Sequence, residues 1–204
     1  MIRLEEVAAV LLCAGLSKRY GPENKLLALL DGKPLARYTA ALCESVPFAA
    51  RIAVVPATEP TLHTLLLNFG FDLIVNPRPE MGKDSSLRLG LAAALRLGVG
   101  GALVLLADMP HVTNVHLRAL SAAADDTTTA ISAAGTTLSP PTLMPAGVVG
   151  EVLARADRPV RASLGSLAHV AAPNSMLADY DRPEQFNRIH RSLRYSPTAV
   201  SRRP

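Results

Sequence analysis

The chain has 204 residues, of which 49% are hydrophobic and 19% are charged; this composition excludes wholesale disorder and is typical of a globular enzyme with a sizeable core. Aromatic residues make up only 4% and tryptophan is absent, which argues against a protein that binds single-stranded nucleic acid by stacking bases on aromatic side chains. The net charge of +4 is spread along the chain, so a small anionic ligand explains it as well as a nucleic acid would.

The first predicted element is a buried strand in the apolar run that begins at Val7. This run has no polar alternation, which is typical of a strand in a parallel sheet that helices cover on both faces. The loop that follows holds Gly15, Ser17 and three cations, and a loop at the carboxyl end of such a strand is where open α/β sheets bind ligands. A phosphate-binding loop and an ordinary turn with solvated cations are equally good interpretations of this stretch alone.

Helices and strands then alternate along the chain. The pattern predicts helices over 34–45 and 60–69 and short strands over 51–55 and 72–75. This alternation indicates an α/β protein with a mostly parallel central sheet. The predicted fold class is therefore a three-layer αβα architecture of the Rossmann-like kind.

A second loop, residues 76–86, precedes an amphipathic helix in which Leu87, Leu91 and Leu95 are spaced by four. Ser85 or Ser86 is the expected N-cap of this helix. One interpretation is simply a capped helix. The other is that the free N–H groups at the helix start, together with Lys83 and Ser86, meet a polar ligand.

The second fully apolar strand, residues 102–107, ends in Asp108-Met109-Pro110. A carboxylate on the last position of a hydrophobic strand is costly to bury unless it is paired or coordinates a cation. Asp108 is therefore the best metal-ligand candidate. The alternative is a turn or N-cap aspartate for the helix that follows.

The carboxyl-terminal third is expected to hold a helix over 113–124 and a strand over 129–133. Residues 135–146 are expected to form an irregular hairpin or connection, and Pro140, Pro141 and Pro145 argue for edge structure. Further expected elements are helices over 147–156 and 160–167, a strand over 169–177 and a helix from 184 to about 193. Residues 1–195 are expected to form one domain, and 196–204 a frayed tail.

Three observations bear on the cellular compartment. Cys13 and Cys43 lie in apolar segments without metal-ligand spacing, so we expect buried, reduced thiols. Glu5 and Glu6 interrupt the resemblance of the amino terminus to a signal peptide. The apolar stretch 97–107 is too short to span a bilayer. These features predict a cytoplasmic protein with no membrane partner.

Four motifs now carry a resemblance to a known family. Residues 12–21, followed by Lys25, resemble the loop L-A-A-G-x-S-x-R-x-G of nucleotidyltransferases with a Rossmann-like fold. Residues 82–91 resemble the base-binding segment, 107–110 the metal motif G-D-M-P, and 179–184 the late motif D-I-D-T-P-E. The similarity covers about residues 5–192. Within the superfamily the chain most resembles the molybdenum cofactor cytidylyltransferases, which have a MobA-like NTP transferase domain.

The resemblance implies transfer of CMP from CTP to the phosphate of molybdopterin, with release of pyrophosphate. It implies catalytic roles for Arg19 on the leaving phosphates, Lys25 near the α-phosphate, and Asp108. Mg²⁺, with Mn²⁺ as the alternative, would be held by Asp108 and Asp179, or by Asp181 in place of Asp179. No strong general base is required because a phosphate nucleophile is already ionised. The implied nucleotide-binding residues are Leu12, Cys13, Ala14, Gly15, Ser17, Lys18, Arg19, Lys25, Gly82, Lys83 and Ser86.

Departures from the family pattern bear on the two substrates. Ala14 matches the cytidylyl branch, which favours CTP over GTP. Residues 139–144 and 156–161 correspond to segments that face the acceptor in the family, and here they lack the family's glycines. Two alternatives therefore stay open: nucleotidyl transfer to a sugar phosphate or another small phosphorylated acceptor, and a non-catalytic carrier of nucleotide or cofactor. A molybdoenzyme or its maturation chaperone would be the protein partner.

Overall fold

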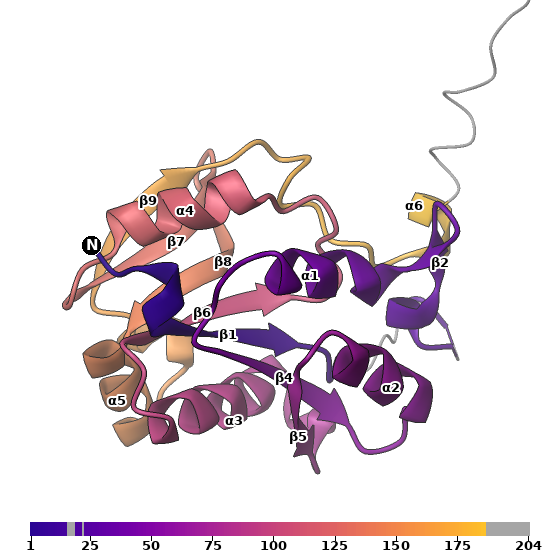
Figure 1. The fold of residues 1–204 in the computed structure, drawn as a ribbon, viewed down its shortest axis with the longest axis horizontal. Coiled ribbons are helices and arrows are strands. Elements are labelled where there is room, and N and C mark those ends of the chain that lie inside the picture. Colours follow the sequence, from indigo (N-terminus) through magenta and orange to yellow (C-terminus); the bar gives the residue numbers. More distant parts are fainter. Residues whose placement is uncertain (16–18, 22, 187–204) are drawn as a thin grey trace, which may run out of the picture.

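The structure is a computed structural model of the chain, in which residues 1–15, 19–21 and 23–186 are described. Its centre is a seven-stranded sheet in the order β5-β4-β1-β6-β8-β7-β9 (Figure 1). Strand β8 is antiparallel to both of its neighbours, and the remaining neighbouring pairs are parallel, which confirms the mostly parallel α/β fold. The strands are β1 Val7–Leu12, β4 Ala50–Pro56, β5 Asp72–Asn76, β6 Gly101–Leu106, β7 Thr128–Ala134, β8 Thr137–Pro145 and β9 Ser166–Ala171, with a separate hairpin of β2 Leu29–Leu30 and β3 Lys33–Pro34.

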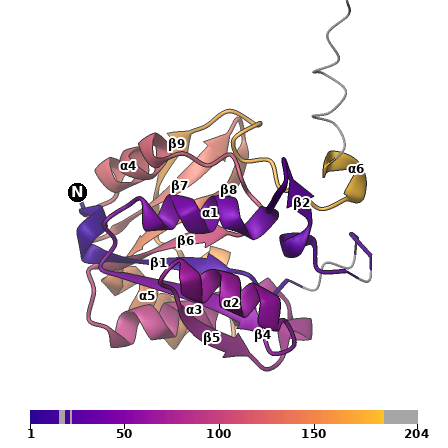
Figure 2. The ribbon, with the colours of Figure 1, turned by 45° about the vertical axis from the view of Figure 1, so that its right-hand side comes forward.

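Helices cover both faces of the sheet, as the unbroken apolar run of β1 predicted. Val7, Ala9 and Leu11 pack into the core cluster that also holds residues of α1, α2 and α4, whereas Ala8 and Val10 face the cluster built on α3 and α5. Figure 2 shows α1 and α2 side by side over their face of the sheet. None of the helices in the described part of the chain is long and apolar enough to cross a membrane. The helices are α1 Leu35–Glu44, α2 Pro60–Asn68, α3 Lys83–Arg96, α4 Asn114–Ala123, α5 Ala146–Ala154 and α6 Pro183–Phe186.

Helix α3 lies unusually close to the sheet at Gly90. A Cβ atom at this position would lie 2.4 Å from Cγ1 of Val10 and 3.1 Å from Cγ2 of Val54. The glycine therefore allows α3 to settle against β1 and β4. Of the three leucines spaced by four, Leu91 is buried and Leu95 is largely exposed.

Strand β8 pairs antiparallel with the preceding strand β7 in an irregular hairpin. The expectation of edge structure for residues 135–146 was wrong, because β8 lies inside the sheet between β6 and β7. The prolines are accommodated by an irregular register, in which Ile131 pairs with Thr142 and the next residue, Ser132, pairs with Ser139. Pro140 and Pro141 thus fall in a bulge and have no opposite residue in the ladder. A bulge removes the requirement for the N–H groups that proline lacks.

Three further boundaries differ from the sequence-based expectations. Residues 160–167 do not form one helix: a short 3₁₀ helix, Val160–Ser163, is followed by β9, which begins at Ser166 and ends at Ala171. Helix α3 begins at Lys83, and its N-cap is Gly82 rather than Ser85 or Ser86. The φ angle of Gly82 is 89°, a left-handed conformation that favours glycine and ends the preceding 3₁₀ turn. The expected helix from 184 to 193 is described only over α6, and its remainder lies outside the described residues.

Candidate active site

The candidate site forms where β1 and β6 end. The two strands are parallel neighbours, with Leu12 paired to Leu106, so the first loop and Asp108 lie at the same edge of the sheet. Cys13 and Ala14 continue the β1 strand and are buried. The second loop follows β5, and β4 separates this strand from β1. The parallel order therefore brings three loop segments of the predicted site to one edge, as it does in open α/β sheets.

Lys25 is the central side chain of this edge. Asn24 accepts a hydrogen bond from the backbone N–H of Leu26 and so caps the short 3₁₀ helix Lys25–Leu27. From this helix, the Nζ atom of Lys25 reaches Oδ2 of Asp108 at 2.5 Å and also contacts Oδ1 of Asp181. The Lys25 side chain is only 10% exposed. It thus joins two carboxylates that follow different strands.

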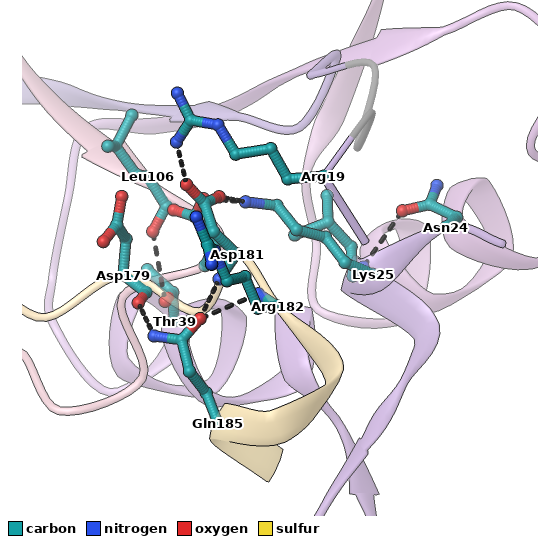
Figure 3. A network of polar contacts seen from close by, with 11 residues as sticks. Arg19, Asn24, Lys25, Thr39, Leu106, Asp179, Asp181, Arg182 and Gln185 are labelled. Atoms are coloured by element: carbon teal, nitrogen blue, oxygen red, sulfur yellow. Dashed lines mark hydrogen bonds and ion pairs between the residues drawn. The ribbon is translucent and has the colours of Figure 1, made fainter. Parts of the chain in front are cut away.

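Arg19, from the first loop, also contacts the carboxylate of Asp181 (Figure 3). Its Nη1 atom lies 2.7 Å from Oδ2 of Asp181, while its side chain is 74% exposed. Asp181 is thus contacted by Lys25 on one oxygen and by Arg19 on the other. Two residues with implied phosphate roles therefore bind protein carboxylates in this structure.

The surroundings of Lys25 and Asp181 keep both side chains charged. Burial lowers the pKa of Lys25, but the neighbouring Asp108 and Asp181 outweigh this effect, and the net result is a raised pKa. The hydrogen bond from Lys25 holds the pKa of Asp181 below its usual value, with further help from the charges of Lys25 and Arg19, against the opposite effect of burial. Both groups are therefore ionised at neutral pH.

Three carboxylates gather beside Lys25. Ligand oxygens of Asp108, Asp179 and Asp181 all lie within 4.8 Å of one another. Oδ1 of Asp108 is buried and has no hydrogen-bond partner in the part of the chain that the structure describes. Thr113, rather than Asp108, caps helix α4, so the alternative of an N-cap aspartate was wrong. An all-oxygen donor set with an orphaned buried oxygen fits a hard divalent cation such as Mg²⁺ or Mn²⁺.

Sequence reasoning missed the residue that holds two of these carboxylates in place. The Gln185 side chain accepts hydrogen bonds from the N–H groups of Asp181 and Arg182 and donates one to the carbonyl of Asp179, with distances of 2.7 to 2.8 Å (Figure 3). The backbone N–H of Tyr180 also donates to the carbonyl of Asp108 at 3.1 Å. The only signal in the sequence was a glutamine directly after the late motif.

At the second loop, Ser86 is buried and engaged by a residue that sequence reasoning did not single out. Asn76, the last residue of β5, donates to Oγ of Ser86 at 2.8 Å and to Oγ of Ser85 at 3.0 Å. Lys83, the first residue of α3, is exposed. The start of α3 is thus fixed to the end of β5.

The first loop is described only in part. Ser17 and Lys18 lie outside the described residues. Gly15 is exposed, and its φ angle is not positive. A Cβ atom at Gly15 would meet no atom of the described residues within 4 Å. The described part of the chain therefore leaves room at this position for an approaching ligand.

Next to the carboxylates lies a hollow of about 500 Å³, lined by His111, Pro173, Ser175, Met176, Ala178 and Tyr180. His111 Nε2 and the hydroxyl of Tyr180 are 3.0 Å apart. Because Tyr180 stands between Asp179 and Asp181 in sequence, this hollow borders the predicted metal site. It is large enough for part of a small organic molecule.

A row of aromatic side chains links the first loop to the late motif, and this too was missed. Tyr20 meets Phe186 edge-on with ring centroids 5.4 Å apart, and Phe186 meets Tyr180 in the same way at 5.3 Å. Such pairs stabilise beyond simple burial. In both views α6 and hairpin β2–β3 lie close together at one end of the molecule (Figures 1 and 2). The row therefore ties α6 to the loop that carries Arg19.

The comparisons with known proteins place this fold and site among the nucleotidyltransferases. A family model described as "MobA-like NTP transferase domain" matches residues 9–171, and the chain belongs to this family. "Purine catabolism protein PucB" of Bacillus subtilis is 30% identical over 94% of this chain and 100% of its own length. "Probable molybdenum cofactor guanylyltransferase" of Pyrococcus horikoshii is 34% identical over 52% of this chain and 50% of its own length.

Solved structures agree on the fold. The Rv0371c homologue from Mycobacterium sp. strain JC1 superposes with a TM-score of 0.76 at 22% identity, covering 94% of this chain and 98% of that chain. A complex of Rv0371c from Mycobacterium tuberculosis with manganese gives 0.73 at 21% identity, covering 92% of this chain and all of the other. At these identities the likeness shows the fold and no more.

Proposed function

We propose that the protein transfers CMP from CTP to the phosphate of molybdopterin and releases pyrophosphate, in a reaction that depends on Mg²⁺ or Mn²⁺. The observation that supports this most directly is Lys25, held between Asp108 and Asp181 at the end of β1 and β6. Cations and carboxylates at one sheet edge are what a triphosphate and its metal both require. Binding of a simple anion would not need three neighbouring carboxylates.

The residues of the chain have distinct tasks in this proposal. The backbone N–H groups of the first loop bind the phosphates, and Arg19 and Lys25 neutralise charge on the departing pyrophosphate. Asp108, Asp179 and Asp181 hold the divalent cation, which supplies Lewis-acid polarisation of the phosphoryl group when bound. The buried Ser86 and the exposed Lys83 at the start of α3 contact the nucleotide from the second loop.

The acceptor is proposed to lie in the hollow lined by His111 and Tyr180. This hollow borders Asp179 and Asp181, so an acceptor phosphate placed there is close to the metal site. The choice of CTP depends on Ala14, which matches the cytidylyl branch of the family. The two curated relatives differ in their names, one being a guanylyltransferase, so the nucleotide must be tested directly.

A second candidate is transfer to another phosphorylated acceptor. The segment that lacks the family's glycines, residues 156–161, is attached to α3, where Asp84 accepts from the N–H of Val160 and Arg88 donates to the carbonyl of Arg158. The absence of the family's glycines from this segment is what favours an acceptor other than molybdopterin.

The test is pyrophosphate release by the purified protein with CTP or GTP, Mg²⁺ or Mn²⁺, and molybdopterin. Release with CTP and molybdopterin supports the proposal. Release with CTP only when a sugar phosphate or another acceptor replaces molybdopterin supports the second candidate. If no combination of nucleotide and acceptor releases pyrophosphate, the protein is not a transferase. That result would favour the alternative of a non-catalytic carrier of nucleotide or cofactor.

A further inference from the structure

We propose that Lys25 stands in for the divalent cation in the nucleotide-free protein, so that the metal binds tightly only after a triphosphate has drawn Lys25 away. This inference rests on the proposed function of the site as a metal-dependent nucleotidyltransferase. It adds an order of binding: the nucleotide binds first or together with the metal, and the metal does not bind tightly on its own. Lys25 is then a switch between two sets of partners as well as a phosphate ligand.

The geometry behind this inference is the placement of one ammonium group between two predicted metal ligands. Nζ of Lys25 contacts Oδ2 of Asp108 and Oδ1 of Asp181, so it already uses one oxygen of each carboxylate. A divalent cation bound to the same oxygens would be only a few ångströms from the ammonium, where like charges repel strongly in a partly buried setting. Lys25 and the metal therefore compete for these oxygens.

Charge balance points the same way. Three carboxylates face two cationic side chains, Lys25 and Arg19, at this edge. An added divalent cation would leave the group with more positive than negative charge unless a cationic side chain moved. The phosphates of a bound triphosphate carry negative charge, so Lys25 and Arg19 can leave the carboxylates and pair with the phosphates instead.

The inference requires both cationic side chains to turn away from the carboxylates while their backbone stays in place. The backbone of Lys25 is held by Asn24 through the 3₁₀ helix, while its long side chain turns about several bonds. The Arg19 side chain is mostly exposed. Oδ1 of Asp108 contacts neither cation and has no partner among the described residues, so it offers an entering metal a first ligand.

The test measures Mn²⁺ binding by the nucleotide-free protein, using the electron paramagnetic resonance signal of free Mn²⁺. Lys25→Met removes the ammonium and keeps the length of the side chain, and it should bind Mn²⁺ at least about tenfold more tightly than the wild type. Lys25→Arg keeps the charge and should show no gain. Lys33→Met, on the exposed part of hairpin β2–β3, is the matched control and should bind like the wild type.

Arg19→Met separates direct competition from a general change in charge. Arg19 contacts Asp181 alone among the three carboxylates, so its removal should raise Mn²⁺ affinity less than Lys25→Met does. Equal gains in the two variants would overturn the inference, as would unchanged or weaker Mn²⁺ binding by Lys25→Met. Adding Asp108→Asn to Lys25→Met should abolish the gain.

The inference and the proposed function fail separately. Without the Lys25 ammonium, Asp108 loses its cationic partner and Asp181 keeps only Arg19. The melting temperature of Lys25→Met should therefore rise more with Mn²⁺ than that of the wild type. If Lys25→Met does not fold, Lys25→Gln gives the same comparison. If the wild type releases pyrophosphate but neither Lys25 variant binds Mn²⁺ more tightly, only the proposed switch by Lys25 is rejected. If a Lys25 variant binds Mn²⁺ more tightly but the wild type releases no pyrophosphate, only the proposed transferase activity is rejected.

Discussion

Asp108 is the residue on which the proposed chemistry depends most. One of its oxygens is held by Lys25 and the other is buried without a partner among the described residues. We expect Asp108→Ala to lower turnover by about 10² or more, because a metal-binding carboxylate acts on charge that develops in the transition state. Turnover is measured as pyrophosphate release, with circular dichroism to check the fold. Asp126→Ala, in an exposed turn, is the control; unchanged turnover of Asp108→Ala would remove Asp108 from the metal site.

Gly15 allows a test of the first loop that leaves the fold unchanged. An added Cβ would meet no atom of the described residues within 4 Å, so Gly15→Ala should keep the melting temperature of the wild type. If phosphates lie against this backbone, the methyl group should raise KM for the nucleotide severalfold, with a smaller effect on kcat. Steady-state kinetics and thermal unfolding of the same preparation check both parts. A normal KM would place the phosphates elsewhere.

The ion pairs of the site could not be predicted from the sequence. Lys25 is 83 residues from Asp108 and 156 residues from Asp181, so only the sheet order brings them together. The residue types themselves were predictable, because a carboxylate after a buried strand and cations in a loop both require an explanation. The hydrogen bonds of Gln185 were not predictable, because they go to backbone groups of a loop without regular structure.

At the scale of the elements, helix α3 offers a matched pair of glycine substitutions. Gly90→Ala would bring a Cβ to 2.4 Å from Val10, so we expect a loss of about 1–3 kcal/mol in the free energy of unfolding. Gly150 lies in helix α5 with no atom within 4 Å of an added Cβ, and Gly150→Ala should be neutral or stabilise by up to about 1 kcal/mol. Urea unfolding measures both. A neutral Gly90→Ala would show that α3 can move away from the sheet.

Helix α4 gives the fold a dependence on pH. His116 is buried, and its Nε2 lies 2.8 Å from Oγ of Ser132 in β7, which donates to the carbonyl of Pro141 in β8. Burial lowers the pKa of His116, so the native state favours the neutral ring. Its contribution to stability should be complete above the unfolded pKa of about 6.5 and should decrease as the pH falls through the lower native value.

Urea unfolding at pH 7.5 and 5.5 measures this effect. The free energy of unfolding of the wild type should be smaller at pH 5.5, and His116→Gln should reduce the difference because its side chain does not titrate. An equal difference in both proteins would assign the pH dependence to other groups.

The strands that carry the site were predictable from their apolar runs, and β8 was not. Proline usually excludes a residue from an interior strand because it cannot donate to the ladder. Here the register between β7 and β8 shifts at Ile131 and Ser132, and the shift leaves Pro140 and Pro141 unpaired. A bulge of this kind depends on the partner strand. Local sequence therefore predicts the wrong position for β8, although it predicts the fold class correctly.

For the molecule as a whole, we propose that residues 1–195 form one domain. Both core clusters are built on the same central sheet, and residues of β1 contribute to each of them. A chain ending at residue 195 should therefore unfold in a single transition with the same midpoint as the full chain. Coincident transitions by circular dichroism and tyrosine fluorescence check this expectation. Two separate transitions would indicate two domains.

The aromatic row has a practical consequence for observing the protein at work. The chain has four tyrosines and no tryptophan, so tyrosine emission is not masked by energy transfer to an indole. Two of these tyrosines, Tyr20 and Tyr180, lie on either side of Phe186, one in the first loop and one between the carboxylates. A movement of the first loop against the late motif is expected to change the surroundings of these phenol rings. The unlabelled protein thus contains its own optical reporter, read at the site itself.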